Sequence, residues 1–137
     1  MKQFLIIPAI ILSSVAAKAQ SIQDAGKNTI AYITKNGELQ DLNKKTVCTF
    51  RQDGKIVDVK SNTLGYIINE YELQDKDHKT VGYILRDGTV ENGSHKVIAR
   101  ISNSGSGPIT DNNDKTIAYI DTIEPMWVAA YLFILKK

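Results

Sequence analysis

The chain of 137 residues has a single cysteine and very few long apolar runs. Because Cys48 has no second cysteine to pair with, an internal disulfide is excluded. No segment reaches the roughly 20 consecutive apolar residues that a membrane-spanning helix needs. We therefore expect a mature chain that is soluble and does not span a membrane.

Motifs for catalysis are also missing. The sequence contains no nucleophile elbow, no phosphate-binding loop and no zinc-protease helix, and it has no helix-forming stretch to carry them. The carboxylates that would pair as acid and base belong to a repeated column or to a turn. The sequence thus predicts a protein that is not an enzyme and that holds no cofactor.

The first 19 residues have the pattern of a secretory signal peptide. A basic start at Lys2 precedes an apolar stretch from Phe4 to Val15, and small residues stand at Ala17 and Ala19. We expect cleavage after Ala19 and a periplasmic or secreted location. No cysteine follows the small residues, so a lipid anchor is not expected.

Removal of this segment changes the charge balance. The whole chain has 17 Lys and Arg against 15 Asp and Glu, but Lys2 and Lys18 lie in the signal peptide and no acid does. The remaining chain is then balanced at 15 of each sign. An electrostatic basis for binding nucleic acid is absent, and we expect no nucleic-acid partner.

An internal repeat dominates the rest of the sequence. A five-residue pattern, usually Thr, aliphatic, small, Tyr, Ile, recurs every 17 residues, and a sixth copy follows after 19. The copies begin at Thr29, Thr46, Thr63, Thr80, Val97 and Thr116. The two extra residues fall in the stretch rich in Gly, Ser and Pro from Ser102 to Pro108. The period predicts a repeat architecture of short strands.

Each copy is followed by the signals of a hairpin. A turn dipeptide comes first, then an aliphatic residue, and two positions later an acid or its amide. The dipeptides are Asn36-Gly37, Asp53-Gly54, Asp87-Gly88 and Ser104-Gly105; the aliphatics are Leu39, Ile56, Leu73, Val90 and Ile109; the last column is Asp41, Asp58, Asp75, Asn92 and Asp111. Each unit therefore reads as strand, tight turn, strand and linking turn.

The register follows from the faces of the strands. A three-residue turn at Lys35-Asn36-Gly37 puts Ile33 and Leu39 on one face, whereas a two-residue turn separates them. We therefore favour the three-residue turn, which also sets Asp41 beside Ala31. The third unit has Glu70-Tyr71 where its siblings end in Gly, and Tyr is strained at positive φ, so this turn should differ.

These units predict an all-β fold of five 17-residue β-hairpin repeats that close around an axis, like a small barrel or propeller. The small position of each unit, occupied by Ala31, Cys48, Gly65, Gly82, Ala99 and Ala118, should face the crowded part of the ring. We expect residues 20–28 to be a lead-in and residues 29–137 to form one domain. The apolar tail 126–135 is expected to be a strand that closes the sheet.

The spacing of these units, together with the signal peptide and the apolar tail, resembles the five-fold β-flower family of small exported bacterial proteins. The resemblance extends from Thr29 to the C-terminus. It implies a β-flower fold and an exported location. The family has no known function, so no site residue is implied. Thr49 and Arg100 depart from the Tyr of most units, and Tyr71 from the Gly.

Four tyrosines recur at one position of the repeat and form a belt: Tyr32, Tyr66, Tyr83 and Tyr119. An exposed belt would stack on sugar rings or hold a peptide, whereas a buried belt would be packing. The strand is apolar on both sides, which favours packing. Exposure of the rings separates the two interpretations.

Other polar residues have both a functional and a structural interpretation. His78 and His95 share one phase of adjacent units and, with Asp77, would form a partial metal site; solvated turn residues are the alternative. The acidic column would bind calcium or, as we prefer, tie its own turns. Cys48 stands at the small position, which favours a buried, inert thiol.

Together these features predict an exported, non-catalytic β-repeat protein that works as a binding or structural module. A glycan or small molecule held by the tyrosine belt is one alternative. A protein partner in the cell envelope, bound through β edges or the apolar tail, is another. A metal-binding protein using His78 and His95 is a minor third.

Overall fold

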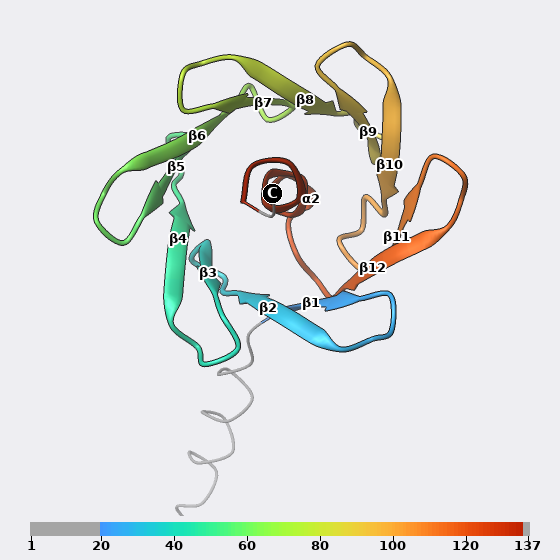
Figure 1. The fold of residues 1–137 in the computed structure, drawn as a ribbon, viewed down its shortest axis with the longest axis horizontal. Helices are drawn as coiled ribbons and strands as arrows, with labels where there is room; N and C mark the ends of the chain where they lie inside the picture. Colours follow the sequence, from blue (N-terminus) through green and yellow to red (C-terminus); the bar gives the residue numbers. More distant parts are fainter. Residues whose placement is uncertain (1–19, 136–137) are drawn as a thin grey trace, which may run out of the picture.

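The computed structural model describes residues 20–135, and the signal-peptide segment lies outside the described residues. Twelve antiparallel strands form one closed barrel in which each strand pairs with its neighbours in sequence (Figure 1). The strands are β1 Gln20–Asp24, β2 Thr29–Ile33, β3 Glu38–Gln40, β4 Thr46–Phe50, β5 Lys55–Asp58, β6 Thr63–Ile68, β7 Glu72–Asp75, β8 Thr80–Ile84, β9 Thr89–Asn92, β10 Val97–Ile101, β11 Gly107–Asp111 and β12 Thr116–Ile120. The predicted all-β ring of hairpin repeats is confirmed.

The two ends of the sheet meet through β1. This strand pairs with β2 on one side and with β12 on the other, where Ile22 lies opposite Ile120 and Asp24 lies opposite Ala118. β12 and β1 thus form a sixth unit from distant parts of the chain. The expectation that residues 20–28 are only a lead-in is wrong, because Gln20–Asp24 is the strand that closes the ring.

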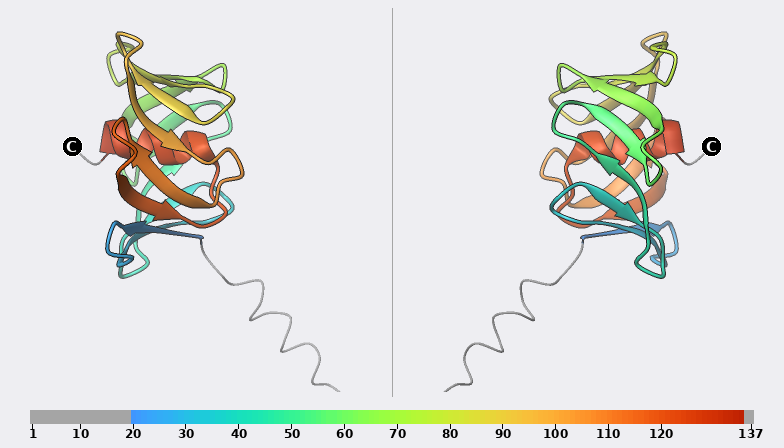
Figure 2. Two further views of the ribbon diagram at one scale, coloured as in Figure 1. Left: turned by 90° about the vertical axis from the view of Figure 1, so that its right-hand side faces the viewer. Right: turned by 90° about the vertical axis from the view of Figure 1, so that its left-hand side faces the viewer.

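The apolar tail is the second correction. It is not a strand: Pro125–Ala130 form helix α2, and Tyr131–Leu135 continue it as a π-helical turn, η1. The helix runs along the axis of the barrel, surrounded by strands on all sides (Figures 1 and 2). A helix enclosed in this way has no face fully open to solvent, so it needs no polar face. Proline at its first turn suits a helix start.

The core lies between this helix and the inner face of the barrel. Each unit contributes two large apolar residues to it, such as Ile33 and Leu39, which are paired as the three-residue turn predicts. The small position also points inward and is buried: a Cβ on Gly82 would lie 2.8 Å from the Phe133 ring. Small residues in this column make room for the central helix.

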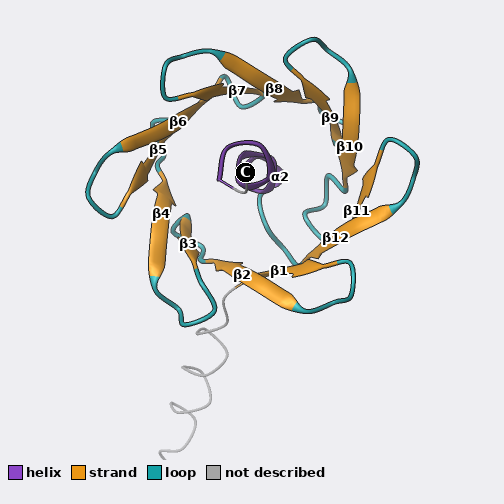
Figure 3. Cartoon of the chain, in the orientation of Figure 1, coloured by secondary structure: helices purple, strands orange, loops and turns teal. Residues whose placement is uncertain are grey.

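Two kinds of turn join the strands at opposite ends of the barrel (Figure 2). The short turns connect β2 to β3 and the equivalent pairs, and the linking turns project outward (Figure 3). A register shift recurs beside each linking turn, between Leu39 and Gln40 for example. Such bulges increase the twist of the strands, which a narrow closed barrel requires.

The short turns hold adjacent units together. Gly37 has φ of 85°, and its carbonyl oxygen accepts a hydrogen bond from the backbone N–H of Phe50 in the next unit, at 2.7 Å. A Cβ on Gly37 would lie 2.6 Å from the Phe50 oxygen, so glycine serves both the turn and the contact. In the third unit the positive φ moves to Asn69 and Glu70, and Tyr71 escapes it. The predicted difference of this turn is confirmed.

Candidate binding surfaces

The tyrosine belt lies on the outer wall of the barrel. Tyr32, Tyr66, Tyr83 and Tyr119 alternate with buried inward residues and are half-buried. The belt is thus neither a fully exposed platform nor a fully buried layer. What decides their role is the residue that covers each ring.

Each ring is covered by the residue at the positive-φ position of a linking turn. His78 stacks on Tyr66 with ring centroids 4.1 Å apart, and His95 stacks on Tyr83 at 4.4 Å. The Lys44 ammonium lies 4.0 Å from the centroid of Tyr32, and Lys27 covers Tyr119 at 5.0 Å. The Tyr83 ring is also stacked with Tyr71, with centroids 5.8 Å apart. These contacts favour the packing interpretation of the belt.

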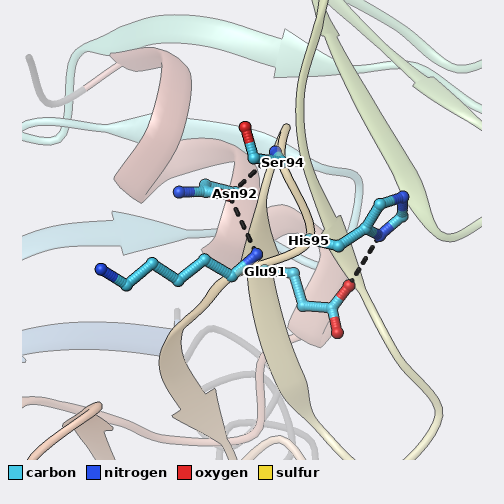
Figure 4. A network of polar contacts seen from close by, with 5 residues as sticks. Glu91, Asn92, Ser94 and His95 are labelled. Carbon is cyan, nitrogen blue, oxygen red and sulfur yellow. Dashed lines mark hydrogen bonds and ion pairs between the residues drawn. The ribbon is translucent and has the colours of Figure 1, made fainter.

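The two histidines belong to separate hairpins and have separate partners. Nδ1 of His95 lies 3.0 Å from the Glu91 carboxylate, and Nδ1 of His78 lies 3.1 Å from the Gln74 side-chain oxygen (Figure 4 shows the first pair). Within residues 20–135, no group of three or more His, Cys, Asp or Glu side chains is placed to hold a metal ion. The geometry gives both histidines a structural role on the outer wall.

The acidic column ties the linking turns. The Asp41 carboxylate accepts hydrogen bonds from the backbone N–H groups of Asn43 and Lys45, at 2.8 and 3.0 Å. Asn92 does the same for Ser94 and Lys96 with its amide oxygen (Figure 4). Asp24, Asp58, Asp75 and Asp111 repeat this geometry. The structural interpretation of the column is therefore confirmed.

These hydrogen bonds stabilise the charged form of the acid. In Asp58, the backbone N–H of Asn62, followed by the Asn62 side chain, lowers the pKa of the carboxyl. Hydrogen bonds from Thr80 and Gln74 likewise lower the pKa of Glu72. Cys48 is the opposite case: burial, aided by the negative charge of Asp58, raises the pKa of its thiol to about 12. The buried position predicted for this cysteine from its column is confirmed.

A groove opens at the end of the barrel where the short turns surround the start of α2. It consists of two clefts, of about 800 and 500 Å³, that share Asn69, Glu70, Glu124 and Met126. We call it the mouth groove. The larger cleft is also lined by Lys35, Asn36, Phe50, Arg51, Gln52, Asp53, Gly54, Ile67 and Trp127. Its size is in the range of ligand-binding sites, and barrel mouths are common places for them.

The mouth groove has an apolar floor and a polar rim. Phe50 and Met126 are buried, and the Trp127 ring stacks on Phe50 with centroids 5.7 Å apart. The rim residues are exposed, among them Arg51 and Asp53, which form an ion pair at 3.1 Å. An apolar surface bordered by a few polar groups is the usual composition of a ligand site.

Sequence reasoning did not find this groove. Glu70, Glu124 and Trp127 come together only because the tail is a central helix that begins between the short turns. One signal was present: the third unit breaks the repeat at Glu70-Tyr71, and that turn separates the two clefts. A break in a regular pattern indicates a position that the fold itself does not dictate.

No helix in the described part of the chain has both the length and the apolar character to cross a membrane. No curated protein and no solved structure shows significant similarity to the chain. The family model described as "5-fold beta-flower protein" matches residues 18–136, which is nearly the whole chain. The chain therefore belongs to the five-fold β-flower family.

Proposed function

We propose that this protein is an exported, non-catalytic binding module whose ligand lies in the mouth groove. The observation that carries the proposal is the composition of the groove: an apolar floor of Phe50, Met126 and Trp127 beneath an exposed polar rim, at the turn where Glu70-Tyr71 breaks the repeat.

Other surfaces considered for binding are less suitable. The closed barrel leaves no unpaired strand edge among residues 20–135, and the apolar tail is enclosed by the strands. The barrel axis is filled by α2, in which Val128, Ala129 and Ala130 are fully buried. A partner that adds a strand or inserts into the barrel has no place to do so.

The structural contacts of the reactive side chains support the absence of catalysis. The repeated acids accept backbone hydrogen bonds in their own turns, and His78 and His95 are stacked on tyrosines. The Cys48 thiol is buried and remains protonated at neutral pH. These groups already make structural contacts. The polar side chains that remain for a ligand are those on the rim of the mouth groove.

Export is supported by the position of β1. The expected cleavage after Ala19 would leave Gln20 as the first residue, and Gln20 is also the first residue of the strand that closes the barrel. Processing at that site keeps the whole sheet. Expression of the full chain in a bacterium, with the intact mass of the exported protein measured, tests this: we expect a chain that starts at Gln20, and an unprocessed cytoplasmic chain would contradict export.

The binding proposal is tested by filling the groove. Gln52 is an exposed residue of the larger cleft, and Gln52→Trp should occupy it; Asn43→Trp, on an exposed linking turn at the other end, is the matched control. A ligand that binds only the folded state raises the melting temperature. We expect a member of a panel of peptides, glycans and metal ions to raise it for the parent protein and Asn43→Trp but not for Gln52→Trp. Equal shifts in both variants, or no shift with any ligand, would overturn the proposal.

A further inference from the structure

The charges around the mouth groove are not evenly distributed. Glu70 and Glu124 line both clefts and therefore lie where the clefts meet. Both are exposed, and neither carboxylate has a hydrogen bond or ion pair within residues 20–135. Arg51 and Asp53, by contrast, neutralise each other on the rim. In the larger cleft, the junction therefore holds two carboxylates, whereas Arg86 lies on the other side of it, in the smaller cleft.

A basic residue lies at the far end of the larger cleft. Lys35 belongs to the turn between β2 and β3, whereas Glu70 belongs to the turn between β6 and β7. The turn between β4 and β5, which carries Arg51 and Asp53, comes between them in the ring. The cleft therefore runs from a negative end at Glu70 and Glu124 to a positive end at Lys35.

Between these two ends, three apolar residues form the floor of the cleft beneath the polar rim. Phe50 and Met126 are 2% and 7% exposed, and the Trp127 ring lies nearly parallel to that of Phe50, at 9°. Flat aromatic rings and a methionine side chain accommodate apolar groups of varied shape. A ligand that complements the whole cleft has a cation at one end, an anion at the other and apolar groups between.

We propose that the mouth groove binds a short peptide with free ends and apolar side chains. This inference rests on the proposed function and gives it a ligand class. The α-ammonium group of the peptide lies against Glu70 and Glu124, its carboxylate faces Lys35, and its side chains cover Phe50, Met126 and Trp127. The groove offers no basic surface for a nucleic acid or other polyanion, because the lining residues Lys35, Arg51 and Arg86 are matched in number by Asp53, Glu70 and Glu124.

Calorimetric titration of the protein from Gln20 onward with the tripeptide Leu-Phe-Leu tests the inference. The N-acetylated peptide lacks the positive charge, and the double variant Glu70→Gln with Glu124→Gln lacks its partners. We expect each change alone to weaken binding by about tenfold or more, as the loss of a charged hydrogen bond does. Because both changes remove the same contact, we expect little further loss when they are combined.

Matched controls keep the outcomes distinct. Asp77→Asn removes an exposed carboxylate at the other end of the barrel and should leave peptide binding unchanged. Equal affinity for the acetylated and free peptides, or no binding of either peptide at millimolar concentration, would overturn this inference. If peptide binding survives Gln52→Trp, the groove itself is the wrong site and the proposed function fails. If Gln52→Trp abolishes binding but acetylation does not weaken it, this inference falls while the proposed function stands.

Discussion

The Arg100 guanidinium lies 3.9 Å from the Asp114 carboxylate, at the two repeat positions that hold Tyr83 and His95 in the preceding unit. The first position is on the outer wall, and the second is the positive-φ residue of the linking turn. Where the ring is lost, the residue that covered it has become an acid suited to the new cation. In the second unit both positions hold small hydroxyl residues, Thr49 and Ser61. The two positions thus form one contact whose chemistry differs between units.

If the two positions act together, the residue pair of one repeat should be replaceable by the pair of another. Arg100→Tyr together with Asp114→His should recreate the stack seen between Tyr83 and His95. We expect a favourable coupling of about 0.5–1.5 kcal/mol between the two changes, the usual range for stacked aromatic pairs. Urea unfolding of the two single variants and the double variant gives this coupling. Purely additive effects would mean that the two positions do not act together.

The hydrogen bonds of the acidic column should make the fold sensitive to low pH. The pKa of Asp58 is lowered in the folded chain, so its contribution to stability is present above the ordinary carboxyl pKa and is lost as the pH falls. Glu72 and Asp87 are shifted in the same direction. We expect the urea midpoint to fall between pH 7 and pH 3.

The same column offers a variant that separates the charge from the hydrogen bonds. Asp58→Asn should keep the turn, because Asn92 ties its own turn with an amide oxygen. Asp58→Ala should lower the melting temperature, because the N–H groups of Lys60 and Asn62 lose their acceptor. A thermal scan of both variants at pH 7 compares them. Equal destabilisation by Asn and Ala would show that the charge, and not the acceptor, matters.

The Cys48 thiol should be inert in the folded protein. Its pKa is raised to about 12, so folding favours the protonated form; this contribution is complete below the pKa of the unfolded thiol and is lost as the pH rises towards 12. We expect no reaction with a thiol reagent at pH 8 unless the protein is unfolded in urea. Cys48→Ala should fold normally, since Ala31, Ala99 and Ala118 occupy the same position. Rapid labelling under native conditions would contradict the buried placement.

The centre of the barrel should not tolerate a larger side chain. Ala129 is fully buried in α2, so Ala129→Leu has to displace neighbouring side chains. We expect a loss of about 1–3 kcal/mol in the free energy of unfolding. Ala25→Leu, on an exposed linking turn, should change it by less than about 0.5 kcal/mol. Denaturant unfolding compares the two, and equal effects would argue against a helix enclosed by strands.

Much of the fold could be predicted from the sequence because the repeat couples local turn chemistry to a regular pattern of faces. The pairing of Ile33 with Leu39 followed from where Gly37 stands, and the burial of Cys48 followed from its column. The strand β1 was missed although its signal was present: Ile22-Gln23-Asp24 lies 17 residues before Leu39-Gln40-Asp41 and has the same pattern. Within residues 20–135, no strand precedes this segment in the sequence to form its hairpin. The strand that pairs with it, β12, comes from the other end of the chain.

The tail was mispredicted for a different reason. A run of apolar residues such as Trp127 to Leu135 has no polar face, so its pattern does not distinguish a buried strand from a buried helix. The closed barrel decides between strand and helix. Its sheet is already complete with β1, and its interior has to be filled by apolar side chains. The mouth groove depends on that helix, and for this reason no single stretch of sequence indicates it.

The enclosed helix is thus the feature on which both the fold and the proposed site depend. Its most direct test is nuclear magnetic resonance of the labelled protein from Gln20 onward. We predict helical Cα shifts from Pro125 to Leu135 and nuclear Overhauser contacts between the Phe133 ring and the backbone of Gly82, which the close approach of the two requires. Extended-strand shifts across this segment, with no contact between Phe133 and Gly82, would contradict the account.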